Sequence, residues 1–125
     1  MEIKVIKENG TEFFLAGDVT DLQVMASRAF CVDIDSNQHE GFFVRVENGD
    51  LFAYKNSCPH TGAPLNWTPD QFLTSSGRYV QCSIHGAMFK PETGECFAGP
   101  CSGKFLQVMK VVEREGQAFV EVEGL

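Results

Sequence analysis

Two short motifs with the same order of residues constrain this chain more than any other feature. The segment CPHTGA begins at Cys58, and CSIHGA begins at Cys82. In each motif a histidine follows the cysteine by two or three positions, and a Gly-Ala pair comes soon after. A thiol and an imidazole this close together are typical of metal ligands. The sequence therefore predicts that two loops bring Cys58, His60, Cys82 and His85 to one metal centre.

Two kinds of centre fit these four side chains. A tetrahedral Zn²⁺ takes two cysteines and two histidines, and a [2Fe–2S] cluster takes the cysteines on one iron and the histidines on the other. Paired zinc ligands usually have two or more residues between them, whereas only Pro59 separates Cys58 from His60. A dinuclear cluster relaxes this limit, because neighbours in the sequence can reach different irons. The spacing favours the cluster and leaves zinc open.

The rest of the chain mostly alternates polar and apolar residues, which is typical of half-buried β-strands. Asn-Gly and Glu-Gly pairs between some of these segments favour hairpin turns. The expected strands cover residues 2–7, 30–35, 42–46, 51–54, 106–112 and 118–122, with turns at 48–50 and 115–117. Only residues 18–28 indicate a helix, and a loop leading into the next strand is the alternative there. The chain is expected to be an all-β protein.

The segment between the two hairpins, residues 55–104, has a different composition. It contains all five prolines and four of the five cysteines. Proline and glycine at this density favour loops over long strands. We expect a loop-rich insert on an antiparallel β-sheet base. No low-complexity linker separates the two, so residues 1–125 are predicted to form a single domain.

Composition excludes several classes of function. The net charge is −7, which argues against nucleic-acid binding because phosphate contacts need clustered lysine and arginine. No apolar segment approaches the roughly 20 residues of a membrane span, and the N-terminus does not read as a leader. A cytoplasmic protein is expected. In that reducing compartment, five cysteines are metal ligands or thiols more often than a disulfide framework.

The two motifs and their neighbours resemble the Rieske [2Fe–2S] family. The first motif continues as HTGAPL at 60–65, and the second continues as HGAMFKPETGE at 85–95. The AGP segment at 98–100 resembles the third loop, which covers the cluster in that family. The resemblance implies a β-sandwich base and one [2Fe–2S] cluster per chain. It also implies that Cys58 and Cys82 bind one iron, and that His60 and His85 bind the other and lie toward solvent.

The chain departs from the respiratory branch of this family at two places. Ala63 and Ile84 stand where that branch has a disulfide, and Ala87 and Phe89 stand where it has two hydroxyl side chains that raise the reduction potential. The resemblance therefore implies a soluble Rieske-type ferredoxin of low potential, about −150 to 0 mV.

No residues suggest catalysis by the chain itself, since neither a nucleophile paired with a base nor a glycine-rich nucleotide motif is present. The expected function is one-electron transfer from a reductase to a terminal oxygenase or another oxidoreductase. One alternative is the small subunit of an enzyme resembling assimilatory nitrite reductase. Another is a zinc-stabilised interaction module.

Three further cysteines lie outside the motifs. Cys96 and Cys101 flank the AGP segment, and the sequence leaves open whether they stay reduced or form a disulfide. Cys31 is expected to pack inside a strand.

His39 and Trp67 are the two remaining side chains that could have a functional role. His39 is expected to be a solvated residue of a polar turn. Trp67 is expected to pack over the long segment at 66–77, whose role the sequence leaves open.

Overall fold

A computed structural model of the chain describes residues 4–34, 36–59, 62–66, 70–83 and 86–121. The predictions made for His60, His85 and Trp67 lie outside the described residues. Within the described residues all regular structure is β-strand. The strands are β1 Val5–Glu8, β2 Thr11–Asp18, β3 Ala26–Ile34, β4 Asn37–Arg45, β5 Leu51–Lys55, β6 Val80–Gln81, β7 Met88–Phe89, β8 Cys96–Ala98, β9 Val108–Met109, β10 Val111–Arg114 and β11 Gln117–Val120.

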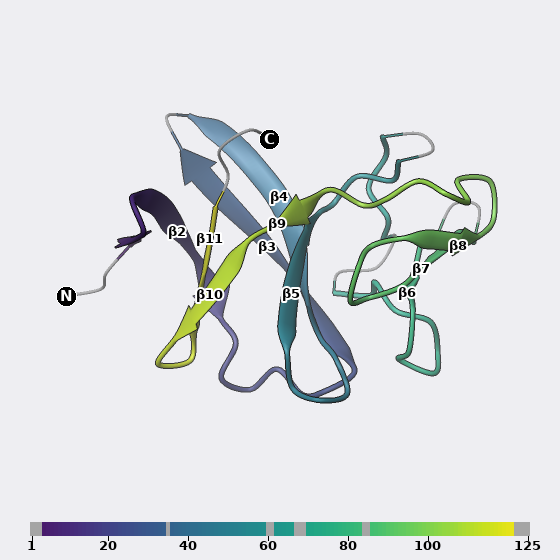
Figure 1. Cartoon of the computed structure of the whole chain (residues 1–125), viewed down its shortest axis with the longest axis horizontal. Coiled ribbons are helices and arrows are strands. Elements are labelled where there is room, and N and C mark those ends of the chain that lie inside the picture. Colours follow the sequence, from purple (N-terminus) through teal and green to yellow (C-terminus); the bar gives the residue numbers. More distant parts are fainter. Residues whose placement is uncertain (1–3, 35, 60–61, 67–69, 84–85, 122–125) are drawn as a thin grey trace.

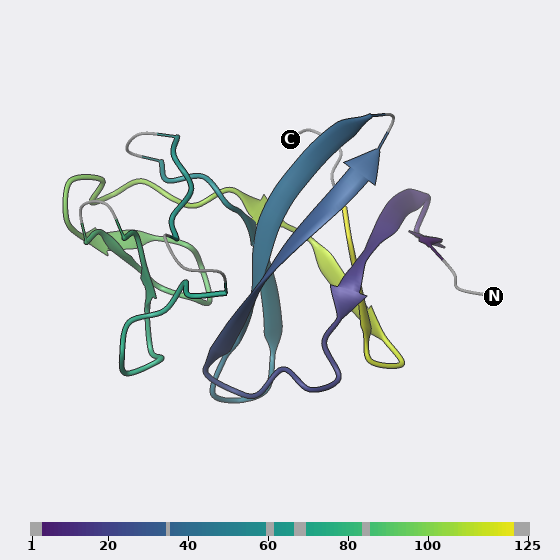
Figure 2. The same ribbon diagram turned by 180° about the vertical axis from the view of Figure 1, so that it is seen from behind.

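The strands form three antiparallel sheets. The outer sheet has the order β1-β2-β11-β10, the middle sheet β3-β4-β5-β9, and the small sheet β6-β7-β8. The small sheet and its loops make up the insert, which lies at the opposite end of the molecule from the N-terminus (Figure 1). The view from behind shows the same arrangement (Figure 2). The all-β prediction, with a β-sandwich base and a loop-rich insert, is confirmed.

The second half of β4 is buried on both faces, which explains its apolar run. Residues 41–44 are all buried. Phe43 packs toward the outer sheet and stacks on Phe30 with ring centroids 4.4 Å apart. Phe42 packs toward the insert and stacks on Phe72 at 4.3 Å. Neighbouring residues of a strand point to opposite faces, so β4 contributes to two separate cores.

Both predicted hairpins are present, with one change. Val46 donates a backbone hydrogen bond to Asp50 across the first turn, and Gly49 there has a φ of 96°. In the second hairpin Arg114 pairs with Gln117, which leaves a two-residue turn. However, the strand expected at 106–112 is divided: β9 pairs with β5 in the middle sheet, and β10 pairs with β11 in the outer sheet. The chain therefore crosses between the sheets there.

The helix predicted at residues 18–28 is wrong, and the loop alternative is correct. β2 continues to Asp18, and β3 begins at Ala26. Between them the Asp18 carboxylate accepts a hydrogen bond from the Thr20 amide, and Met25 has a φ of 60°. Asx turns and left-handed residues compete with helix formation. The turn at Asp18 and the left-handed Met25 therefore favour a loop over a helix.

Two predictions about single side chains are also wrong. Cys31 is exposed on β3, because Phe30 and Val32 take the buried face and Cys31 alternates with them. His39 is in β4 and pairs with Val32 of β3, and it is half-buried. The turn between these strands comes earlier, so β4 starts before His39.

Within the segment at 66–77, the described residues 70–77 attach the insert to the base. Phe72 is 1% exposed and stacks on Phe42 of β4. The Asp70 carboxylate accepts a hydrogen bond from the amide of Ala29 at 2.7 Å, and the Ser27 hydroxyl donates to the Asp70 carbonyl. β3 is the edge strand of the middle sheet, so Asp70 satisfies an edge amide that would otherwise face solvent.

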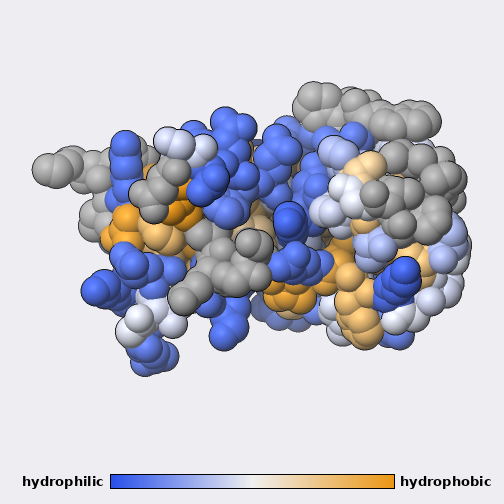
Figure 3. Space-filling model, turned by 90° about the horizontal axis from the view of Figure 1, so that it is seen from above, coloured by the Kyte–Doolittle hydropathy of each residue, from blue (hydrophilic) through white to orange (hydrophobic). Residues whose placement is uncertain are grey.

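The described part of the chain contains no helix that is long and apolar enough to span a membrane. Seen from above, the middle of the molecule is mostly hydrophilic, while apolar residues reach the surface toward both ends (Figure 3). On the insert the exposed apolar side chains are Tyr79, Phe97 and Phe105.

Candidate metal centre

Cys58 and Cys82 begin two loops that have the same backbone hydrogen bonds. The amide of Cys58 donates to the carbonyl of Ala63, and the amide of Cys82 donates to that of Ala87, each at 2.8 Å. Each loop also has a glycine amide that donates back to the cysteine carbonyl, at 2.7 Å in the first loop and 2.9 Å in the second. The similarity of the CPHTGA and CSIHGA motifs is therefore a similarity of conformation, and it sets both cysteines in equivalent positions.

Gly62 and Gly86 are the glycines that close these two loops. Their φ angles are 80° and 70°, in the left-handed region where side chains are unfavourable. Their amides donate to the carbonyls of Cys58 and Cys82. The requirement for glycine comes from the turn itself.

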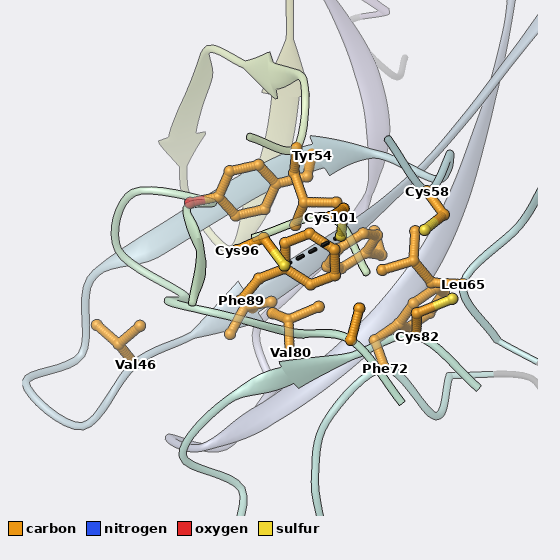
Figure 4. Close-up of a cluster of buried hydrophobic side chains, with 14 residues drawn as sticks. Val46, Tyr54, Cys58, Leu65, Phe72, Val80, Cys82, Phe89, Cys96 and Cys101 are labelled. Carbon is orange, nitrogen blue, oxygen red and sulfur yellow. Dashed lines mark hydrogen bonds between the residues drawn. The ribbon is translucent and has the colours of Figure 1, made fainter. Parts of the chain in front are cut away.

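A direct hydrogen bond ties the two cysteine loops together. The amide of Ser83, next to Cys82, donates to the carbonyl of Leu65 at 2.7 Å. Leu65 follows the first loop, is fully buried, and lies beside both Cys58 and Cys82 (Figure 4). Leu65 therefore packs between the loops and holds their spacing.

Asn56 supports the first loop from the end of β5. Its side-chain oxygen accepts the amide of Leu65 at 2.8 Å, and its side-chain nitrogen donates to Asn66 at 3.0 Å. Its own amide donates to the carbonyl of Glu40 on β4. Asn56 thus joins the loop to the middle sheet. No local sequence pattern signals this role, because the partners of Asn56 become neighbours only in the fold.

The AGP segment at 98–100 packs on the second loop. A Cβ at Gly99 would lie 2.8 Å from the Cα of Ala87, so the backbones are in close contact and no side chain fits between them. Ala87 is fully buried. This position agrees with the resemblance to a loop that covers the cluster.

Cys96 and Cys101 come together beneath this covering segment. Their sulfur atoms are 3.0 Å apart, and both residues are buried (Figure 4). Burial, together with the neighbouring sulfurs of Cys96 and Cys58, raises the pKa of Cys101 to about 12. Cys101 is therefore a protonated thiol at neutral pH.

The described ends of the two loops differ in exposure from the cysteines. Cys58 and Cys82 are each 1% exposed. Gly62, two positions after His60, and Gly86, directly after His85, are both exposed. The backbone therefore runs from a buried cysteine to the surface within each loop.

This arrangement fits an iron–sulfur centre as far as the described residues go. Two buried sulfur donors come from equivalent loops, and neither forms a disulfide. Groups of three or more potential metal ligands do not occur among the described residues, where only two of the four predicted ligands lie. The two thiols on their own form half of the predicted donor set, and the predicted histidine ligands lie outside the described residues.

A family model, the Rieske [2Fe-2S] domain, matches residues 10–117. The match spans most of the chain, so this protein belongs to the Rieske [2Fe-2S] domain family. It confirms the family resemblance and the predicted [2Fe–2S] cofactor, and it decides against the zinc reading of the motifs. Among proteins with curated descriptions, none matches this sequence.

Solved structures share the fold at low sequence identity. The ferredoxin of carbazole 1,9a-dioxygenase from Nocardioides aromaticivorans IC177 is 21% identical with a TM-score of 0.66, and the match covers 89% of this chain and 98% of that one. A chain from the complex of reduced oxygenase and oxidised ferredoxin in carbazole 1,9a-dioxygenase is 24% identical, with a TM-score of 0.65 and coverage of 87% and 92%.

A third similar structure is the terminal oxygenase of carbazole 1,9a-dioxygenase from Novosphingobium sp. KA1. It is 18% identical with a TM-score of 0.69. The match covers 90% of this chain but only 30% of the oxygenase chain. The fold of this protein thus corresponds to whole ferredoxins and to one part of an oxygenase.

Proposed function

We propose that this chain is a Rieske-type ferredoxin, a one-electron carrier that passes electrons from a reductase to a terminal oxygenase or another oxidoreductase. The observation that carries the proposal is the pair of equivalent loops, each of which runs from a buried cysteine to an exposed glycine just beyond a histidine. The family match supports the cofactor.

The proposed ligands are Cys58 and Cys82 on one iron and His60 and His85 on the other. Both cysteines sit where their loops are closed by backbone hydrogen bonds, and the Ser83–Leu65 bond fixes one loop against the other. The exposed glycines beside the histidines favour a histidine end that faces the surface. A surface-facing end shortens the distance over which an electron must pass to a partner.

When bound, the [2Fe–2S] cluster supplies the ability to accept and release one electron. The contribution of the chain is to hold the ligands in place and to exclude water from the cysteine side. The buried side chains of Leu65, Ala87 and Leu106 cluster with the two cysteines and keep that side dry. A rigid, dry environment reduces the reorganisation that accompanies a change in charge.

The partners are proposed from the similar structures. One of them comes from a complex between an oxygenase and a ferredoxin, and another is the ferredoxin of a dioxygenase system. A match that extends over nearly all of such a ferredoxin supports a carrier. A cytoplasmic location suits a carrier between enzymes and belongs to the same proposal.

The test begins with the purified protein in its cluster-bound form. After reduction with dithionite and removal of excess reductant, the protein is mixed anaerobically with an oxidised ring-hydroxylating terminal oxygenase, and the visible spectrum is followed. Reoxidation that accelerates with oxygenase concentration is expected. A rate equal to that with bovine serum albumin would refute the proposal for that acceptor class.

Affinity purification from the native host distinguishes the alternative of an enzyme subunit. A carrier should elute without a stoichiometric partner at moderate salt. A large subunit that coelutes in constant ratio would favour a small subunit like that of assimilatory nitrite reductase.

A further inference from the structure

Cys96 and Cys101 form a close sulfur pair outside the four proposed cluster ligands. The Cys101 thiol donates to the Cys96 sulfur at 3.0 Å, and the Cys96 thiol is directed to the carbonyl of Ala98 at 3.2 Å. Each residue is 1% exposed. A disulfide has an S–S distance of about 2.05 Å, so the two sulfurs are roughly 1 Å from bonding distance.

The backbone fixes this juxtaposition. The amide of Cys96 donates to the carbonyl of Lys104 at 2.8 Å, and the amide of Gly103 donates back to the carbonyl of Cys96 at 3.0 Å. The amide of Lys104 in turn bonds to the carbonyl of Cys101. The chain thus folds back on itself after β8 and returns Cys101 to Cys96. The proximity belongs to the loop and does not depend on a side-chain rotamer alone.

We propose that Cys96 and Cys101 are a redox-active dithiol site, which low-molecular-weight disulfides such as glutathione disulfide oxidise to an intramolecular disulfide. One protein sulfur attacks the small disulfide and releases one small thiol. The second protein sulfur then displaces the other small thiol from the mixed disulfide. In total, two protein S–H bonds and one small S–S bond are replaced by one protein S–S bond and two small S–H bonds, so both protons and both electrons leave with the small thiols.

The disulfide would close the covering segment against the metal centre. Cys96 and Cys101 flank the stretch at 97–100, in which Gly99 touches the backbone of Ala87 in the second cysteine loop. Joining the two ends of this stretch restricts its opening. Oxidation is therefore expected to slow the loss of the cluster, a consequence that rests on the proposed function, whereas the cross-link itself does not.

The first experiment detects the cross-link in the cluster-bound protein. The protein is incubated with glutathione disulfide, quenched in acid so that released sulfide leaves as hydrogen sulfide, then denatured and alkylated with N-ethylmaleimide. Three fewer alkylated cysteines are expected than in the untreated protein, two from the cross-link and one from a glutathione adduct at Cys31. Peptide mass spectrometry should place the cross-link, two hydrogens lighter than the two free thiols, between Cys96 and Cys101.

Cys31 provides the internal control because it is exposed and alone. It should form a glutathione adduct without a cross-link, and Cys31→Ser should leave the cross-link unchanged. Cys96→Ser should abolish the cross-link. The proposal is overturned if Cys96 and Cys101 both remain alkylatable after Cys31 has reacted fully, including on warming to the temperature at which the visible absorbance begins to fall. A cross-link from either one to Cys58 would overturn it as well.

The second experiment measures the loss of visible absorbance in excess iron chelator. The oxidised protein should lose its cluster several-fold more slowly than the reduced protein, and glutathione disulfide should have no effect on the rate in Cys101→Ser. Equal rates in oxidised and reduced wild type would refute the closing role. Failure of the electron-transfer assay with the terminal oxygenase would overturn the proposed function but would leave the cross-link measured in the first experiment unaffected.

Discussion

The base and the insert of this protein are held together in different ways. The base has strands of four to nine residues in its ladders, apart from β9, and the second half of β4 is buried on both faces. The strands of the insert are two or three residues long, and its order comes from loop hydrogen bonds, from contacts with the base and from the ligands of the metal centre. The base is therefore expected to fold without the cluster, whereas the insert is expected to depend on it.

The two regions share a buried hydrophobic core. Phe72 stacks on Phe42, and the Tyr54 hydroxyl donates to the carbonyl of Pro91 at 2.7 Å. Burial raises the pKa of Tyr54, so this hydroxyl keeps its proton and the bond persists over the physiological pH range. Substitutions in the two regions are therefore expected to change stability and cluster binding separately.

The largest effect is expected from removing one ligand. Cys82→Ser should abolish the visible absorption of the cluster, because serine replaces a thiolate that the iron requires. The far-UV circular dichroism of the base strands should persist. Cys31→Ser is the matched control and should keep the full visible spectrum. A normal spectrum for Cys82→Ser would remove Cys82 from the ligand set.

Chelation of the iron should separate the two regions in the unaltered chain. Hydrogen exchange by mass spectrometry is expected to show loss of protection at the amides of Cys58, Cys82 and Ser83, which bond only within the insert. The amide of Val44 in the middle sheet should stay protected. Equal loss in both regions would show that the base also depends on the cluster.

The joint between the regions should be the most sensitive point for stability. Phe72→Ala is expected to lower the free energy of unfolding by about 3–5 kcal/mol, because it removes a buried aromatic ring and leaves a cavity. The measurement is denaturant unfolding of the cluster-bound protein. Phe97→Ala is the control in the same insert, because Phe97 is 39% exposed, and it should cost much less. Similar costs for both would contradict the role given to Phe72.

A substitution in the base should reduce stability without affecting the centre. Arg45 is largely buried and donates to the carbonyls of Val19 and Leu22 and to Glu113 of the outer sheet. Arg45→Met should cost about 2 kcal/mol, since bonds from a charged donor are lost. The reduction potential should stay at the wild-type value, predicted at about −150 to 0 mV. A redox titration that shifts with Arg45→Met would contradict the separation of the two regions.

The smallest effect concerns the covering segment. Gly99→Ala should destabilise the protein by about 1–3 kcal/mol and speed cluster loss in chelator, because its Cβ would clash with Ala87. Gly103→Ala is the matched control: its φ of 89° is similar to the 97° of Gly99, but a Cβ there meets nothing within 4 Å. Equal rates of cluster loss in the two variants would show that backbone conformation alone, and not the contact with Ala87, sets the effect.

The sequence predicted the parts of this molecule that depend on local chemistry. The repeated Cys-His motifs identified both loops, and glycine at position 49 marked a real turn. Strand β2 was missed because Phe13, Phe14, Leu15 and Ala16 are consecutive and hide the alternation. That run is half-buried in the structure, apart from the buried Phe13.

The contacts that could not be predicted join residues far apart in the sequence. Asp70 bonds to Ala29 across 41 positions, and Tyr54 bonds to Pro91 across 37. No local pattern encodes such pairs, so the role of the segment at 66–77 emerged only from the fold. The assignment of His60 and His85, the single domain over 1–125 and the reduction potential stay predictions.

Pulsed EPR of the reduced protein, prepared with ¹⁵N-labelled histidine, tests the central claim most directly. His39 is the one histidine that is not a proposed ligand. The measurement is therefore made on His39→Asn, in which the two proposed ligands are the only labelled histidines. Two strongly coupled ¹⁵N nuclei are expected in this variant. One is expected in each further variant that lacks His60 or His85 but retains a cluster. A reduced cluster with no coupled histidine nitrogen would contradict the central claim.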